Sequence, residues 1–181
     1  HLEKIVQYNV QSSEKEKFDG VMLDIEPYIS DSWKENPEEY MDRYISCMKK
    51  GYKFAQKNHL RTAICIPRHY DNQGLTSGLE ELIKETCDEV AVMNYSCGNE
   101  IEAIRTEAAL SEKYGKELHC ILEFQEVGKH GLTENKTYRN KGIDNAKETW
   151  EKLQKEYKNI NVTRDYHWSR PVREMLEEKN A

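Results

Sequence analysis

Apolar residues recur along this chain in two alternating patterns, as short continuous runs and as longer stretches with helical spacing. The short runs predict strands at residues 18–27, 60–67, 89–96, 117–125 and 159–168. The longer stretches predict helices at residues 2–14, 36–58, 78–87, 100–114, 141–158 and 172–179. Strands that alternate with helices are typical of a parallel α/β architecture.

Capping residues support three of these helices. Asn36 is the expected N-cap of helix 36–58, and Pro37 occupies its first helical position. Ser77 and Glu80 have the spacing of a capping box for helix 78–87. Gly115 is expected to end helix 100–114.

Polar side chains gather where the predicted strands end. They are Asp24 and Glu26, Arg68 and His69, Asn94 and Tyr95, Glu123 to Glu126, and Asp165 to Trp168. A (β/α)8 barrel builds its active site at the carboxyl ends of its strands, and a full barrel has about 250 residues. No Gly-rich phosphate loop follows any strand, which disfavours a nucleotide-binding Rossmann domain. We therefore expect one domain, residues 1–181, that forms the last five strands of a TIM barrel and lacks the first three.

Composition narrows the classes of partner. Hydrophobic residues make up 37% of the chain and charged residues 33%, and the net charge is −6, with acids and bases interleaved. This balance is typical of a soluble globular protein and argues against a nucleic-acid partner. No apolar run approaches the ~20 residues that span a membrane. The sequence sets no localisation, and a bacterial secreted or cell-surface location is compatible with it.

Cysteine and histidine spacing gives no metal or disulfide pattern. The cysteines are Cys47, Cys65, Cys87, Cys97 and Cys120. They are odd in number, scattered, and without a CxxC pair, so neither a zinc site nor a disulfide framework is expected. His69 and His167 stand at strand ends without a third convergent ligand. We expect no metal and no organic cofactor.

The stretch FDGVMLDIEP, residues 18–27, ends an apolar strand with two acids. Because side chains alternate between the faces of a strand, Val21, Leu23 and Ile25 are expected to pack under helices. Met22, Asp24 and Glu26 would then share the face that lines a cleft. When two carboxylates lie so close together, their titrations are coupled. One of them can then stay protonated for general acid catalysis.

FDGVMLDIE also resembles the signature of glycoside hydrolase family 18, the chitinase and endo-N-acetylglucosaminidase family. That signature, D-G-x-D-x-D-x-E, ends the fourth barrel strand. Asp19, Gly20, Asp24 and Glu26 match it, and Met22 stands where the family has its middle Asp.

Two further motifs extend the resemblance over nearly the whole chain. VAVMNYS is similar to the M-x-Y-D motif of the sixth strand, with Met93 and Tyr95 in place and Ser96 at the Asp position. Trp168 ends the last strand, where the family has a Trp that floors the sugar subsite.

The resemblance implies substrate-assisted retaining hydrolysis of a glycan that contains N-acetylhexosamine, an exception to the two-carboxylate scheme. Glu26 would protonate the glycosidic oxygen, Asp24 and Tyr95 would orient the 2-acetamido group, and Trp168 would stack on the sugar. The remaining strand-end residues are expected to bind substrate. They are Asn94, Glu123, Gln125 and Arg68.

Two alternatives stay open. Glu26 and Glu123 could instead form the pair of a retaining glycosidase, in which the carboxyl groups lie ~5–5.5 Å apart. Met22 favours the other alternative, a non-catalytic carbohydrate-binding or scaffold barrel remnant. We expect the 181-residue chain alone to be inactive, and its open sheet edges to require self-association or the N-terminal half. Residues 126–142 form a polar loop that is a candidate substrate lid.

Overall fold

The computed structural model describes the backbone of residues 1–180 and the side chains of residues 1–178. Its strands are β1 (Gly20–Asp24), β2 (Arg61–Pro67), β3 (Glu89–Met93), β4 (Glu117–Glu123) and β5 (Val162–His167). They form one all-parallel sheet in the order β1-β2-β3-β4-β5, and this sheet is not closed. A doubly wound sheet reverses its order at a switch point, whereas this order follows the chain, as consecutive barrel units do. The predicted α/β fold with five parallel strands is confirmed.

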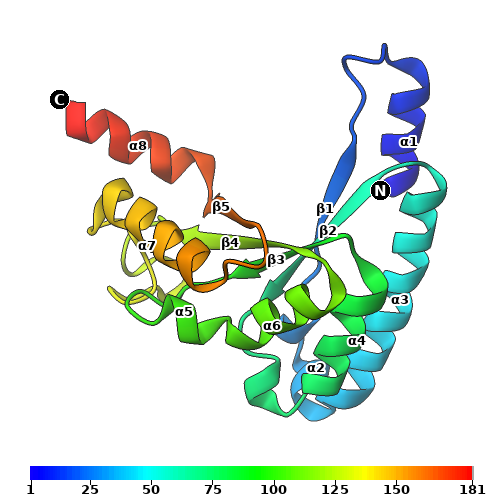
Figure 1. Cartoon of the computed structure of the whole chain (residues 1–181), viewed down its shortest axis with the longest axis horizontal. Helices are drawn as coiled ribbons and strands as arrows, with labels where there is room; N and C mark the ends of the chain where they lie inside the picture. The colour runs from blue at the N-terminus through cyan, green and yellow to red at the C-terminus, as the bar shows by residue number, and fades with distance from the viewer. Residues whose placement is uncertain (181) are drawn as a thin grey trace. The chain divides into compact units, whose positions relative to one another are not determined.

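Helices connect the strands in the predicted alternation (Figure 1). They are α1 (Leu2–Gln11), α2 (Asp31–Glu35), α3 (Pro37–Lys57), α4 (Thr76–Thr86), α5 (Glu100–Ala103), α6 (Arg105–Tyr114), α7 (Gly142–Glu156) and α8 (Ser169–Asn180). Three short 3-10 turns lie in the loops: η1 (Pro27–Ile29), η2 (Asp71–Gln73) and η3 (Lys129–Gly131). None of the described helices is long and apolar enough to cross a membrane.

The chain divides into two compact units. Unit 1 comprises residues 1–66 and 70–90, and unit 2 comprises residues 67–69 and the chain from residue 91 onward. The division passes through β2 and β3. The expectation of a single domain over 1–181 stays a prediction, and each unit is described by itself below.

In unit 1, β1 pairs with β2 from Gly20 opposite Arg61 to Asp24 opposite Cys65. A Cβ atom on Gly20 would lie 2.9 Å from the carbonyl oxygen of Arg61, so only glycine fits at the start of this strand pair. Helices α3 and α4 pack against each other (Figure 1). At Gly78 of α4 this contact leaves no room for a side chain, because a Cβ atom would lie 2.5 Å from Cγ of Met41.

In unit 2, β4 pairs with β5 from Leu118 opposite Val162 to Glu123 opposite His167. Alternate residues from β4 onward are fully buried: Leu118, Cys120, Leu122 and Phe124. Trp150 of α7 donates a hydrogen bond through Nε1 to the Cys120 carbonyl oxygen at 2.9 Å. The helix-covered face of β4 is therefore the even-numbered one, and His119, Ile121 and Glu123 share the other face.

Two of the predicted helix caps can be compared with the structure. Asn36 caps α3 as expected, and its side chain accepts a hydrogen bond from the Glu39 N–H. The Ser77–Glu80 capping box is wrong, because α4 already begins at Thr76 and its N-cap, Leu75, offers no side-chain acceptor.

The predicted helix 100–114 is two helices, because Ile104 leaves helical geometry (φ −126°, ψ 20°). Gly115 ends the second one in left-handed geometry, as predicted (φ 63°). Helix α2 is too short to show helical periodicity, and its one local signal is the Ser30 side chain, which accepts a hydrogen bond from the Trp33 N–H.

Candidate functional site

The two acids of the opening motif lie at the end of β1 in unit 1. Asp24 is the last residue of the strand and is exposed. Met22, on the same face, is 47% exposed, whereas Val21 and Leu23 are half-buried. The expected alternation therefore holds within the strand. It is wrong for Ile25, which is 44% exposed because the strand ends one residue before it.

Glu26 is half-buried and follows the strand directly. Its Oε1 atom accepts a hydrogen bond from the Tyr28 hydroxyl. The Tyr28 ring meets the buried Tyr70 ring edge-on at 6.1 Å, and Tyr70 in turn lies 5.5 Å from the ring of Trp33. Burial, with the hydrogen bond to Glu26, raises the pKa of Tyr28 far above its ordinary value, so this hydroxyl stays a donor. Sequence reasoning missed Tyr28, for which the E-P-Y spacing is the only local signal.

In unit 2, Glu123 ends β4 with its side chain only 2% exposed. Oε1 accepts hydrogen bonds from the N–H groups of Phe124 (2.8 Å) and Gln125 (2.7 Å). Oε2 lies 2.9 Å from Nδ1 of His167 and accepts a second bond from Nε2 of Gln125 at 3.2 Å. Burial by itself raises the pKa of Glu123, but the bonds from His167 and the Gln125 backbone outweigh it and hold the pKa below its ordinary value. Glu123 is thus an ionised acceptor with both oxygens engaged, which supports a positioning role and weighs against a nucleophile.

His167 links the predicted residues of unit 2, although sequence reasoning treated it as a simple strand-end residue. Its ring centroid lies 6.1 Å from that of Tyr95, with the planes tilted by 30°. Trp168 follows it directly and is 44% exposed. The structure therefore brings Tyr95, Glu123 and Gln125 together around His167. The sequence signal for this grouping was that Asp165 and His167 are two residues apart at the end of β5 and therefore lie on the same face of the strand.

The side chain of Asn94 has a structural role in the fold. It is fully buried, and its Nδ2 atom donates to the Glu100 carbonyl oxygen at 2.9 Å. Its backbone N–H donates to the Ile121 carbonyl oxygen at 2.9 Å. Met93 and Tyr95 flank it on the opposite face of the chain. The structure therefore gives Asn94 a place in the fold, away from the ring of Tyr95. Arg68 follows β2 and is half-buried.

The loop predicted as a lid, residues 126–142, is anchored at its second half. The N–H of Tyr138 donates to the Glu123 carbonyl oxygen at 2.7 Å, and Oγ1 of Thr137 donates to the Gln125 carbonyl oxygen at 2.7 Å. Both residues are buried. The Asn135 carbonyl oxygen also accepts a hydrogen bond from the Cys97 N–H at 2.8 Å, so movement of the whole loop would break these bonds and the setting of Glu123.

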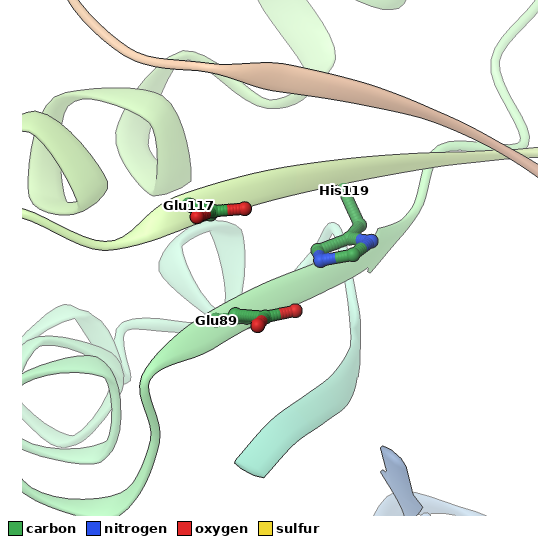
Figure 2. A group of neighbouring side chains, drawn as sticks. All are labelled: Glu89, Glu117 and His119. Carbon is green, nitrogen blue, oxygen red and sulfur yellow. The ribbon is translucent and has the colours of Figure 1, made fainter. Parts of the chain in front are cut away.

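The other end of β4 carries Glu117 and His119 on one face, shown with Glu89 of β3 in Figure 2. Nδ1 of His119 lies 2.9 Å from Oδ2 of Asp165 on β5, so this ring nitrogen is engaged within unit 2. In unit 1, Glu89 pairs with Arg61 at 2.6 Å. Unit 2 alone offers two ligands here, fewer than the three protein ligands of catalytic zinc sites.

A comparison of the chain with family models, with curated proteins and with solved structures found no significant match. The resemblance to glycoside hydrolase family 18 is therefore carried by the quoted motifs alone.

Proposed function

We propose that this chain belongs to a glycoside hydrolase that cleaves glycans containing β-linked N-acetylhexosamine with assistance from the substrate. The observation that carries the proposal is the end of β1, where Asp24 is exposed and Glu26 follows two residues later. In a parallel α/β fold the carboxyl ends of the strands are where catalytic groups lie. The Tyr28 hydroxyl engages one carboxylate oxygen of Glu26, and Asp24 is exposed at the strand end.

Glu26 would serve as the general acid. The Tyr28 hydroxyl binds its Oε1 atom, which fixes the carboxyl plane and leaves Oε2 to carry the proton to the glycosidic oxygen. Asp24 would orient the 2-acetamido group, whose carbonyl oxygen attacks the anomeric carbon. The C–O bond to the leaving sugar breaks as the proton from Glu26 reaches it, and water later opens the oxazolinium intermediate.

Unit 2 by itself carries groups that can contact sugars. Trp168 offers an exposed ring face, on which the apolar face of a pyranose can stack. Tyr95 and Gln125 are further groups of this unit that can contact a sugar. The buried Glu123 would act through His167, which it holds in place.

Binding without turnover is the second candidate, and Met22 favours it. The thioether is 47% exposed on the face that also carries Asp24. A thioether cannot share a proton with a neighbouring carboxylate, so the middle acid of the family signature has no functional substitute here. Such a site would retain sugar contacts while its rate of hydrolysis falls.

Tryptophan fluorescence tests the ligand class, because Trp33 and Trp150 are buried and Trp168 alone is exposed. We expect chitotetraose to change the emission saturably, and cellotetraose, which lacks the acetamido groups, to leave it unchanged. Trp168→Phe serves as the control that removes the reporter. Mass analysis of chitotetraose incubated with the product of the whole gene then separates the two candidates: chitobiose would appear for a hydrolase, and intact chitotetraose would remain for a binding protein. Equal responses to both tetrasaccharides would contradict both.

A further inference from the structure

A cavity of about 500 Å³ lies in unit 2 between the segment that contains α5 and one face of α7. This volume is in the range of small-molecule sites. None of the strand-end residues Tyr95, Glu123, Gln125 or Trp168 lines it. The cavity is therefore separate from the glycan face described above and needs its own explanation.

Glu100 gives the cavity its chemical character. This residue is only 9% exposed. Its Oε1 atom accepts hydrogen bonds from the Gly98 N–H at 2.9 Å and from the Tyr138 hydroxyl. No described residue donates to Oε2, and no described lysine, arginine or histidine forms an ion pair with Glu100. A nearly buried carboxylate with one unengaged oxygen thus faces the cavity.

The wall around Glu100 is rigid. The Tyr138 hydroxyl also lies 2.7 Å from Oγ1 of Thr149 on α7. Burial and the bond to Glu100 raise the pKa of Tyr138 far above its ordinary value, so the hydroxyl donates at every physiological pH. The Asn94 side chain holds the Glu100 carbonyl oxygen from the other side. The carboxylate is therefore fixed before any ligand arrives, which lowers the entropic cost of binding.

The cationic side chains at the rim of the cavity do not neutralise the negative charge of its carboxylates. Lys141 is engaged by the Glu134 carbonyl oxygen, and Glu102 is paired with Arg105. Lys141 keeps its charge, because its carbonyl partner is neutral, and Lys152 is the other lysine in the lining, against Glu148 and Glu156. With Glu100 at the base, carboxylates outnumber the available cations.

We infer that this cavity binds a small organic cation, with a primary ammonium group placed against Oε2 of Glu100. An ammonium group offers three N–H donors to a carboxylate that has no cationic partner, and such charge-assisted bonds are the strong ones. Asn145 of α7 lines the cavity and can contact a hydroxyl group of the same ligand. Among the described residues, the acidic side chains here do not bring three ligand atoms within 4.8 Å of one another, so a metal ion is not the expected occupant.

The test follows the Gly98 amide by NMR, because its N–H donates to Glu100. Glucosamine at pH 6.5, where its amine is charged, ethanolamine and uncharged glucose are titrated at constant ionic strength. Saturable shifts with both amines and none with glucose are expected. Tighter binding of glucosamine than of ethanolamine would show that the cavity also recognises the sugar ring. Tighter binding of ethanolamine would show that the ammonium group alone is recognised. Since this reporter is remote in sequence from Trp168, the result is independent of the proposed glycan activity.

Three variants sharpen the test. Glu100→Gln keeps the acceptor for Gly98 and Tyr138 but removes the charge, and it should weaken amine binding about tenfold or more. Lys152→Met removes a rim cation and should tighten binding. Glu151→Gln, an exposed change on α7 outside the cavity lining, should leave the affinity unchanged. A glucose response equal to that of glucosamine, or an affinity that Glu100→Gln and Lys152→Met leave unchanged, would overturn the inference.

Discussion

Oε2 of Glu123 lies 2.9 Å from Nδ1 of His167, and the two residues are register partners on β4 and β5. A second pair of the same kind joins these strands with the residue types exchanged, since Nδ1 of His119 lies 2.9 Å from Oδ2 of Asp165. All four side chains lie on one face of the strands. The edge strand β5, and Trp168 directly after it, are therefore held by two imidazole–carboxylate bonds.

Acid should weaken this arrangement. The pKa of Glu123 is lower in the folded chain than its ordinary value, so its stabilising contribution is present at neutral pH and is lost as the pH falls through the folded pKa. We expect Glu123→Gln to cost about 2 kcal/mol of unfolding free energy at pH 7 and to flatten the decline below about pH 4.5. Urea unfolding between pH 3 and pH 7 measures both. An identical pH slope in the variant would refute the role of Glu123.

The tautomer of His167 provides a spectroscopic prediction. An ionised carboxylate only accepts, so Glu123 keeps a proton on Nδ1. In Glu123→Gln the amide can donate instead, and the neutral Nε2–H tautomer should gain population in the 15N spectrum of the imidazole. Asp165→Asn is the matched control, because it should change the His119 signals and leave those of His167 in place. A His167 spectrum that is insensitive to Glu123→Gln would contradict the assignment.

Two helical glycines should respond to alanine in opposite directions. A Cβ atom at Gly78 would lie 2.5 Å from Cγ of the buried Met41, so Gly78→Ala forces α3 and α4 apart and should cost about 1–3 kcal/mol. At Gly51 the nearest atom is 3.8 Å away, and Gly51→Ala should stabilise the helix by about 0.5–1 kcal/mol. Thermal unfolding of the two variants compares them directly. A gain in stability for Gly78→Ala would show that the α3–α4 contact is looser than described.

Asn94 and Trp168 should separate folding from binding. Removing the buried amide of Asn94 leaves the Glu100 carbonyl oxygen without its donor, so Asn94→Ala should cost about 1–3 kcal/mol of stability. Trp168→Ala should leave stability nearly unchanged and weaken chitotetraose binding about tenfold or more. Chemical unfolding and calorimetric titration of both variants measure the two effects. A loss of stability in Trp168→Ala with unchanged binding, or a loss of binding in Asn94→Ala with unchanged stability, would contradict these roles.

The sequence predicted the fold well because periodicity and capping are local. The strands and the main helices follow from apolar spacing, and Asn36 and Gly115 mark helix ends where expected. The break at Ile104 was not predictable, since nothing in its neighbours opposes helix. The five-residue α2 is too short for periodicity to act on.

The candidate site was predictable only in part. Asp24 and Glu26 stand out because two acids interrupt an apolar run, and a single strand suffices to see them. The grouping of Glu123 with His167 depends on the β4–β5 register, which links residues 44 apart in the sequence. Asn94 looked like a ligand residue from its position at a strand end, but its side chain turns to the helix-covered side and is used by the backbone of Glu100.

The most direct test of the central claim is release of 4-methylumbelliferone from its N,N′-diacetylchitobioside by the product of the whole gene. The account predicts measurable release that Glu26→Gln lowers by about 100-fold or more, the usual range for a lost general acid. Glu123→Gln, which alters a positioning residue, should retain more of the activity than Glu26→Gln. Full activity in the Glu26→Gln variant would contradict the account.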